Sequence, residues 1–474
     1  MSASSQRRYT PATAPAEKPA LLRQLGVVSA TALVISNMVG TGIFTSTGFL
    51  AGDLGSPSLV LGIWVVGAIA ALFGAFCYSE LGVNFPSSGG EYVYLTQGFG
   101  PSWGFMTGWV SFFAGFSAPI AAAALACSDY LGYFFPALKQ SSAMLVLGSG
   151  QYAWKIGGAQ IVACALVTVF SVLNFFGVRR VARVQNLLTG IKIAVILGFI
   201  LLGLTAGRGD WNNFSVPATR WASTPLPQQF AVSLFWIYVA YSGWNAATYV
   251  AEELKQPAKT LPIALALGTV LVAVLFLALN VVFIYGVPLE QMKGVVAVGS
   301  LTASRLFGPQ IAGVFSALMA VGLLATVNAM VTIGPRVYYA MAKNRAFPEA
   351  AGRVNARWHT PVVAIIAQGV CTMFMALTPF RDLMTYIGML LNFFAVMAVA
   401  SLLIFRRREG WQKLPVVSFL YPAIPVLFIA IGLWMTYQGI SKQPVVSGAA
   451  ALTVVTGALF YRFRLHGAKV DGAA

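Results

Sequence analysis

The sequence predicts an all-α membrane protein with twelve transmembrane helices. Of its 474 residues, 58% are hydrophobic and only 9% are charged, whereas an average soluble domain has about 25% charged residues. Apolar runs of about 20 residues, the length that spans a bilayer as a helix, recur along the whole chain. Water would not solvate such a composition as a globule, so the helices are expected to lie in lipid.

Twelve apolar runs are long enough to serve as membrane-spanning segments. In chain order they are expected at 25–51, 57–84, 100–131, 154–177, 184–206, 226–253, 261–287, 308–342, 361–379, 383–406, 415–437 and 445–463. Residues 1–22, ahead of the first segment, are rich in Pro, Ala and Ser and lack the apolar core of a signal peptide. They are therefore expected to form a disordered tail.

Basic residues predict the orientation of these segments. An even number of crossings places both termini on one side, and most of the 30 Lys and Arg residues fall in the tails and loops of that side. Loops rich in Lys and Arg stay in the cytoplasm, so both termini are expected there, in a protein of the plasma or inner membrane. The same distribution accounts for the net charge of +17 without a nucleic-acid partner.

The first and sixth segments contain similar interruptions. Gly40-Thr41-Gly42 interrupts the first segment near its middle, and Ser242-Gly243 interrupts the sixth. Five crossings separate the two, and because this number is odd the second unit would run inverted, as in secondary transporters whose site lies at the breaks. Small residues also serve helix packing alone, but two interruptions in register favour a site. The chain is accordingly expected to divide into a cytoplasmic tail, two inverted repeats of five segments, two added segments and a second cytoplasmic tail, at 1–22, 23–206, 226–407, 413–464 and 465–474.

Broken helices expose backbone groups that bind a zwitterion. The N-terminal end of a half-helix attracts anions and the C-terminal end attracts cations. The N–H groups of Thr41 and Gly42 are therefore expected to hold a carboxylate. The carbonyls around Met38, Val239 and Ser242 are expected to hold an ammonium group. The full set of expected substrate-binding residues is Met38, Thr41, Gly42, Ile43, Tyr238, Val239, Ser242 and Asn245, with Asn245 bonding across the second break.

Charged residues narrow the substrate class. All 13 acidic residues fall in tails, in loops or near expected helix ends, which suits a net-neutral amino acid. Lys192 is the exception, because it lies inside the fifth segment, where a lysine costs about 2.5–3.5 kcal/mol on insertion scales. It would take the place of a coupling sodium ion on carbonyls of the first segment, or shuttle a proton; a lysine that snorkels to the interface is the structural alternative. No metal site and no cofactor are expected.

Four stretches together resemble the amino acid–polyamine–organocation superfamily. They are "MVGTGIF", "YSELGVNFPSSGGEYVYL", "RVQNLLTGIK" and "AYSGWNAATYVAEELKQPAKTLPIA". The resemblance is to the L-type amino acid transporter branch and its bacterial alanine–serine–cysteine exchanger relatives. It implies the five-plus-five inverted-repeat fold of leucine transporter-like proteins. It also implies alternating access, in which segments 1, 2, 6 and 7 rock against 3, 4, 8 and 9 while 5 and 10 gate.

The resemblance assigns roles to several residues and leaves one position open. Thr41 and Gly42 match the turn that binds the carboxylate, and Lys192 matches a lysine linked to sodium-independent transport. Many L-type members carry a large aromatic gate where this sequence has Val239, so Tyr238 or Trp236 would have to replace it. Mammalian members use a single-span glycoprotein partner and bacterial members do not. No obligate protein partner is expected for this chain.

These observations predict a transporter rather than an enzyme. The expected function is sodium-independent exchange or proton symport of neutral L-amino acids across the membrane. A cationic amino acid or polyamine transporter of the same superfamily is the alternative, and it would need a carboxylate that faces the pocket. An intramembrane enzyme or a receptor is disfavoured, because the sequence has no HExxH motif, Ser–His pair or intramembrane aspartate dyad.

Overall fold

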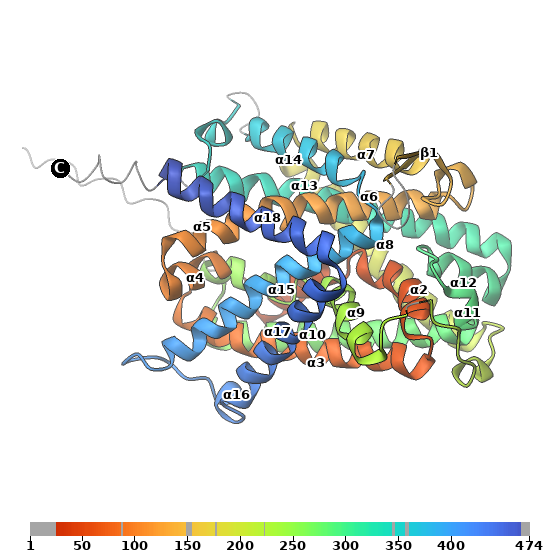
Figure 1. Cartoon of the computed structure of the whole chain (residues 1–474), viewed down its shortest axis with the longest axis horizontal. Coiled ribbons are helices and arrows are strands. Elements are labelled where there is room, and N and C mark those ends of the chain that lie inside the picture. The colour runs from red at the N-terminus through yellow and green to blue at the C-terminus, as the bar shows by residue number, and fades with distance from the viewer. Residues whose placement is uncertain are drawn as a thin grey trace, which may run out of the picture.

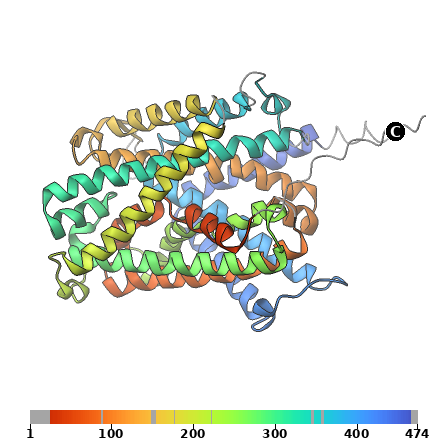
Figure 2. The same cartoon turned by 180° about the vertical axis from the view of Figure 1, so that it is seen from behind.

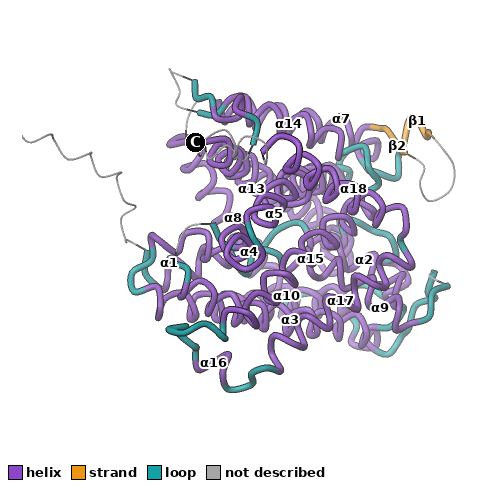
Figure 3. Tube along the Cα trace, turned by 60° about the vertical axis from the view of Figure 1, so that its left-hand side comes forward, coloured by secondary structure: helices purple, strands orange, loops and turns teal. Residues whose placement is uncertain are grey.

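The computed structural model describes residues 25–86, 89–147, 154–175, 178–221, 223–343, 347–355 and 360–465. The tail expected at 1–22 lies outside these ranges, as does all but the first residue of the tail expected at 465–474. Helices make up about four-fifths of the described chain, and Figure 3 shows a short hairpin of strands at one corner. The predicted all-α class is thereby confirmed.

The first half of the chain holds the elements of the five segments expected there. In order they are α1 (Val27–Met38), α2 (Gly42–Leu54), α3 (Pro57–Asn84), α4 (Glu91–Phe99), α5 (Pro101–Val110), the π-helix η1 (Ser111–Ser117), α6 (Ala118–Leu131), the 3₁₀-helix η2 (Pro136–Leu138), α7 (Gly158–Phe175) and α8 (Val178–Thr205). The hairpin strands β1 (Ala143–Leu147) and β2 (Trp154–Gly157) pair antiparallel. The fourth segment was expected from residue 154, and this start is wrong because β2 occupies residues 154–157.

The second half follows in the same manner. Its elements are η4 (Trp211–Phe214), α9 (Leu226–Tyr241), η5 (Ala246–Glu253), α10 (Pro257–Gly286), α11 (Leu289–Met292), α12 (Val298–Phe307), α13 (Pro309–Lys343), η6 (Glu349–Gly352), α14 (Val362–Met375), α15 (Phe380–Phe405), α16 (Pro415–Ser418), α17 (Ala423–Lys442), α18 (Pro444–Phe460) and η7 (Tyr461–Leu465). The eleventh segment, expected from residue 415, is wrong at its start. A proline caps the beginning of α17, and proline opens a helix but cannot continue one.

Nine helices in the described ranges are long and apolar enough to cross a membrane, and the bent pair α1 and α2 brings the number to ten. Helix α14 is apolar but has only 14 residues, and α9 stops after 16 residues at the second break. A multi-pass membrane protein is therefore confirmed. The number of twelve crossings stays a prediction.

Segments that lie five places apart in the sequence pack against each other. Helix α2 contacts α9 and α1 contacts η5, while α3 contacts α10, α6 contacts α13 and α7 contacts α14. Figures 1 and 2 show α3 and α10 along one edge of the molecule and α7, α13 and α14 along the opposite edge. Two interlocked five-segment units would pair in this way. The inverted repeat itself stays a prediction.

Candidate functional site

The first segment is broken between α1 and α2. Helix α1 ends at Met38, α2 begins at Gly42, and the two axes differ by 44°. The first N–H groups of a helix have no intrahelical partner. This holds for the N–H groups of Gly42 and Ile43, whereas the Phe44 N–H donates to the Thr41 carbonyl. The Met38 carbonyl, expected to face an ammonium group, accepts a hydrogen bond from the Gly40 N–H at 2.8 Å.

The sixth segment is broken between α9 and η5. Ser242 leaves helical geometry after Tyr241, and Gly243 has a φ of +100°, in the left-handed region that favours glycine. The Val239 carbonyl accepts from the Ser242 N–H at 3.1 Å and from the Ser242 hydroxyl at 2.7 Å. Both predicted interruptions of helices 1 and 6 are thus confirmed. The carbonyl of Val239 is held by its own chain in this conformation.

The two breaks lie directly against each other. A Cβ added at Gly42 would overlap the backbone of Ala240, and a Cβ at Gly243 would come within 2.8 Å of the Asn37 carbonyl carbon. Gly40 differs, because the nearest atom to a Cβ there is 3.9 Å away. Gly42 and Gly243 therefore allow close packing, the role that small residues often have in membrane helices, and the same packing brings the two sets of half-helix ends together.

Lys192 reaches the first break from α8. Its side chain is 3% exposed, and its ammonium nitrogen donates to the Val39 carbonyl at 2.5 Å. Gly322 of α13 leaves room for its methylene stem. In Figure 2 the yellow helix α8 crosses diagonally in front of the bundle beside the short red helix α1. The positive charge therefore lies at the C-terminal end of α1, where the helix dipole favours a cation and partly offsets the cost of burial.

A carboxylate that the sequence reasoning missed lies next to the second break. Glu91, the first residue of α4, accepts from Tyr78 at 3.0 Å, from the Asn245 amide at 2.7 Å and from Tyr249 at 2.5 Å. We refer to Tyr78, Glu91, Asn245 and Tyr249 as the Glu91 cluster. Burial raises the pKa of Glu91, and the three hydrogen bonds partly oppose that change.

The Glu91 cluster corrects two expectations. Asn245 bonds to Glu91 and Tyr249, so the expected bond across the gap of the sixth segment is wrong. The acids were also expected to stay away from the site, whereas Glu91 touches a residue of the break. Its signal was present in the stretch "SGGEYVYL", which the resemblance used without giving the glutamate a role.

A second carboxylate joins α2 to α9 at a distance from the breaks. Asp53, near the end of α2, is 1% exposed and pairs with Arg381 of α15 at 2.6 Å. Its oxygens also accept from the Trp221 indole at 2.7 Å and from the Ser233 hydroxyl of α9 at 3.3 Å. These four residues, called the Asp53 cluster below, connect α2, α9, α15 and the loop before α9.

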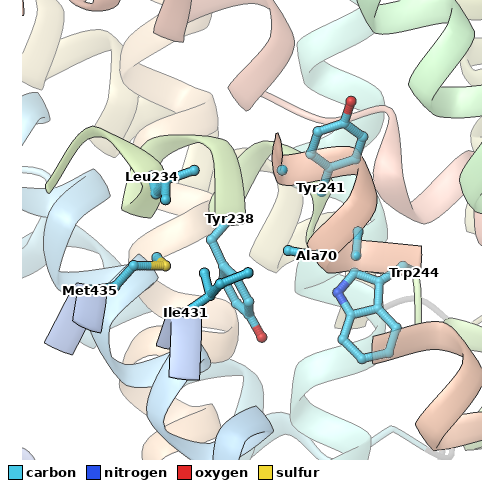
Figure 4. Close-up of a pocket in the computed structure, with 9 residues that line it drawn as sticks. Ala70, Leu234, Tyr238, Tyr241, Trp244, Ile431 and Met435 are labelled. Atoms are coloured by element: carbon cyan, nitrogen blue, oxygen red, sulfur yellow. The ribbon is translucent and has the colours of Figure 1, made fainter. Parts of the chain in front are cut away.

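The aromatic residues proposed to replace the missing gate lie in different surroundings. Trp236 is fully buried, with its ring 4.5 Å from that of Phe49. Tyr238 lines a small cavity between α3, α9 and α17, and Figure 4 shows its ring beside Ile431 with Trp244 on one side. The cavity measures about 20 Å³, the space of one water molecule. Of these two candidates for the gate, only Tyr238 lines the cavity, although the cavity is too small for an amino acid.

Several known proteins resemble the chain over most of its length. Residues 25–460 match the family model "Amino acid permease". The chain is 28% identical to "Large neutral amino acids transporter small subunit 2" of Mus musculus, over 93% of this chain and 81% of the relative. It is also 28% identical to "Serine/threonine exchanger SteT" of Bacillus subtilis (strain 168), over 87% and 90% of the two chains. A third relative, "Cystine/glutamate transporter" of Pongo abelii, is 28% identical over 94% and 86%.

Proposed function

Because the chain belongs to the amino acid permease family, we propose that it is a sodium-independent secondary transporter of neutral L-amino acids that works by alternating access. The contact between the two helix breaks carries this proposal, since it brings anion-binding and cation-binding half-helix ends together. The printed names of the murine and Bacillus relatives, which refer to large neutral amino acids and to serine and threonine, support the same substrate class.

The substrate would bind between the breaks as a zwitterion. The N–H groups of Gly42 and Ile43, with the Thr41 hydroxyl, would hold its carboxylate. Carbonyls around Met38, Val239 and Ser242 would hold its ammonium group after they exchange the bonds that they make within the chain. Tyr238 would close over the side chain, because Val239 is too small to do so.

Lys192 would replace a coupling sodium ion. Its ammonium group already occupies a carbonyl at the end of α1, the kind of ligand that a cation would use there. If Lys192 takes up and releases a proton in each transport cycle, the carrier would be a proton symporter. If Lys192 stays protonated throughout, the carrier would be an exchanger. The protein would lie in the plasma or inner membrane with both termini in the cytoplasm. It would act without an obligate protein partner, although the murine relative is named as a small subunit.

One observation favours the alternative of a cationic substrate. That function needs a carboxylate at the pocket, and Glu91 contacts Asn245 beside the break. Three donors of the chain itself already occupy the Glu91 oxygens, so a neutral substrate remains the better fit.

Reconstitution of the purified protein into liposomes tests the proposal. Labelled serine, alanine or leucine should enter liposomes loaded with the unlabelled amino acid, at equal rates with sodium and with potassium outside. Uptake that requires a pH gradient and no internal amino acid would identify symport. Saturable uptake of arginine or putrescine without uptake of any neutral amino acid would contradict the neutral class and support the alternative.

A further inference from the structure

Three donors from three parts of the fold meet on one carboxylate at the second break. Tyr78 comes from α3, Asn245 from the break itself and Tyr249 from η5, while Glu91 opens α4. Asn245 is the capping residue of η5, and Tyr249 lies one turn further along. Glu91 therefore links η5 to α3 and α4 through hydrogen bonds.

No positive charge balances Glu91 among the side chains that the structure describes. The ion pairs found there join other residues, namely Lys293 with Glu290, Arg381 with Asp53 and Arg406 with Glu80. Among the side chains that the structure describes, the titratable groups that interact with Glu91 are tyrosines: Tyr78 from α3, Tyr94 from α4, Tyr238 from α9 and Tyr249 from η5. A partly buried carboxylate without a cation gains free energy either by taking up a proton or by moving into water.

The cluster accommodates a protonated Glu91 without losing its contacts. A tyrosine hydroxyl both donates and accepts, so Tyr249 is able to turn and accept the carboxyl proton. Asn245 keeps its bond to the other carboxyl oxygen. Since burial raises the pKa of Glu91, the packed arrangement binds a proton more tightly than an arrangement in which water reaches the carboxyl group. By linkage, acid favours the packed arrangement and loss of the proton favours its opening.

Movement of η5 would reach the first broken helix directly. The Lys255 N–H, just after η5, donates to the Leu25 carbonyl just before α1 at 2.8 Å. A backbone hydrogen bond thus joins the start of α1 to the end of η5. Release of η5 from Glu91 would carry the start of α1 with it.

We propose that Glu91 is a proton-sensitive positioning residue for the transport site. Protonated Glu91 keeps η5 packed on α3 and α4. When Glu91 loses the proton, η5 and the start of α1 move away together and expose the two breaks on the side of α1 and η5. The inference deepens the proposed function and rests on it, because it assigns to Glu91 the control of one face of the same site.

Hydrogen exchange of the full-length protein tests the proposal without any substrate. Protection of backbone amides at 242–255, corrected for the intrinsic pH dependence of exchange, should fall as the pH rises in the wild type. Glu91→Gln, which resembles the protonated form, should stay protected at every pH. The matched control Glu409→Gln, on an exposed loop, should follow the wild type. A Glu91→Gln profile that falls like the wild type would overturn the inference.

A second variant keeps the carboxylate and removes one donor. Tyr249→Phe should raise the pKa of Glu91 further and shift the midpoint of the protection profile to higher pH. An unshifted midpoint would contradict the inference even if Glu91→Gln fails to fold. In liposomes, KM for the transported amino acid should change by about tenfold across the same pH range in the wild type and stay constant in Glu91→Gln. Protection that follows pH in a protein without any amino acid transport would refute the proposed function and leave the role of Glu91 standing.

Discussion

The Asp53 cluster and the Glu91 cluster solve a similar structural problem with different chemistry. Each uses one carboxylate to hold a half of the sixth segment in place: Asp53 binds Ser233 of α9, and Glu91 binds Asn245 and Tyr249 at η5. Asp53 has the guanidinium of Arg381 as its partner, whereas Glu91 has only neutral donors among the described side chains. The Glu91 end lacks a cationic partner among these side chains, and its carboxyl pKa is raised by burial, so it is the end for which we propose a response to pH.

The two carboxylate clusters act on one site only if the two helix breaks are in direct contact. Gly42→Ala tests this contact. The added Cβ would overlap Ala240, so α2 and α9 would have to separate. We expect loss of amino acid binding and the largest loss of stability among the variants considered, more than about 3 kcal/mol. Thermal unfolding in detergent and binding of serine or leucine measure the two effects.

Gly40→Ala is the matched control for that variant. The nearest atom to its new Cβ is 3.9 Å away, so the melting temperature and the binding should stay close to those of the wild type. If Gly40→Ala and Gly42→Ala lower the melting temperature and the binding equally, the contact between the breaks is not the reason for the glycines.

Arg381→Gln removes the feature that separates the two clusters. Asp53 would remain buried without its cation. Breaking a buried pair costs about 3–5 kcal/mol, but Arg381 is 36% exposed, so we expect about 2–3 kcal/mol of lost stability. The double variant Asp53→Asn with Arg381→Gln should recover part of this loss, because no uncompensated charge is left. A double variant less stable than Arg381→Gln would contradict the ion-pair interpretation.

Lys192→Met tests whether the Lys192 ammonium group at the first break is needed for transport or only for folding. The substitution keeps most of the apolar stem and removes the ammonium group that binds the Val39 carbonyl. We expect exchange in liposomes to fall by about tenfold or more, the effect of about 1.4 kcal/mol, while the melting temperature changes little. Unimpaired transport would return Lys192 to a structural role.

The breaks and Lys192 were predictable from the sequence, because each is an unusual residue or short stretch within an apolar run. Gly40-Thr41-Gly42 and Lys192 stand out within apolar runs, where lipid gives no reason for them. The helix bounds confirm the break in the first segment. Lys192 contacts the Val39 carbonyl at the end of α1, as its proposed role requires. These features depend on neighbours in the chain, which a sequence displays directly.

The two carboxylate clusters were not predictable in the same way. Asp53 and Arg381 are 328 positions apart, and Glu91 and Asn245 are 154 apart. Each acid lies near a helix end, where an ordinary solvated carboxylate is the default expectation. Only the folding of α2 against α15, and of α4 against the second break, makes them partners. The wrong expectation for Asn245 has the same cause, because its partner belongs to α4.

The smallest effect gives the sharpest comparison, because the two clusters should respond to the same chemical change with opposite signs. Asp53→Asn leaves Arg381 without its partner and should destabilise the protein near pH 8. Glu91→Gln should not. The folded-state pKa of Glu91 is raised above its ordinary value of 4.5, so its favourable contribution is complete below that value and is lost as the pH rises through the raised pKa. Near pH 8 Glu91→Gln should therefore equal or exceed the wild type in stability, by up to about 1 kcal/mol, and the gap should close on acidification. Melting temperatures measured across pH 4.5–8 for both variants decide the matter, and a Glu91→Gln protein that is destabilised most at high pH would show that Glu91 acts as a charged brace like Asp53.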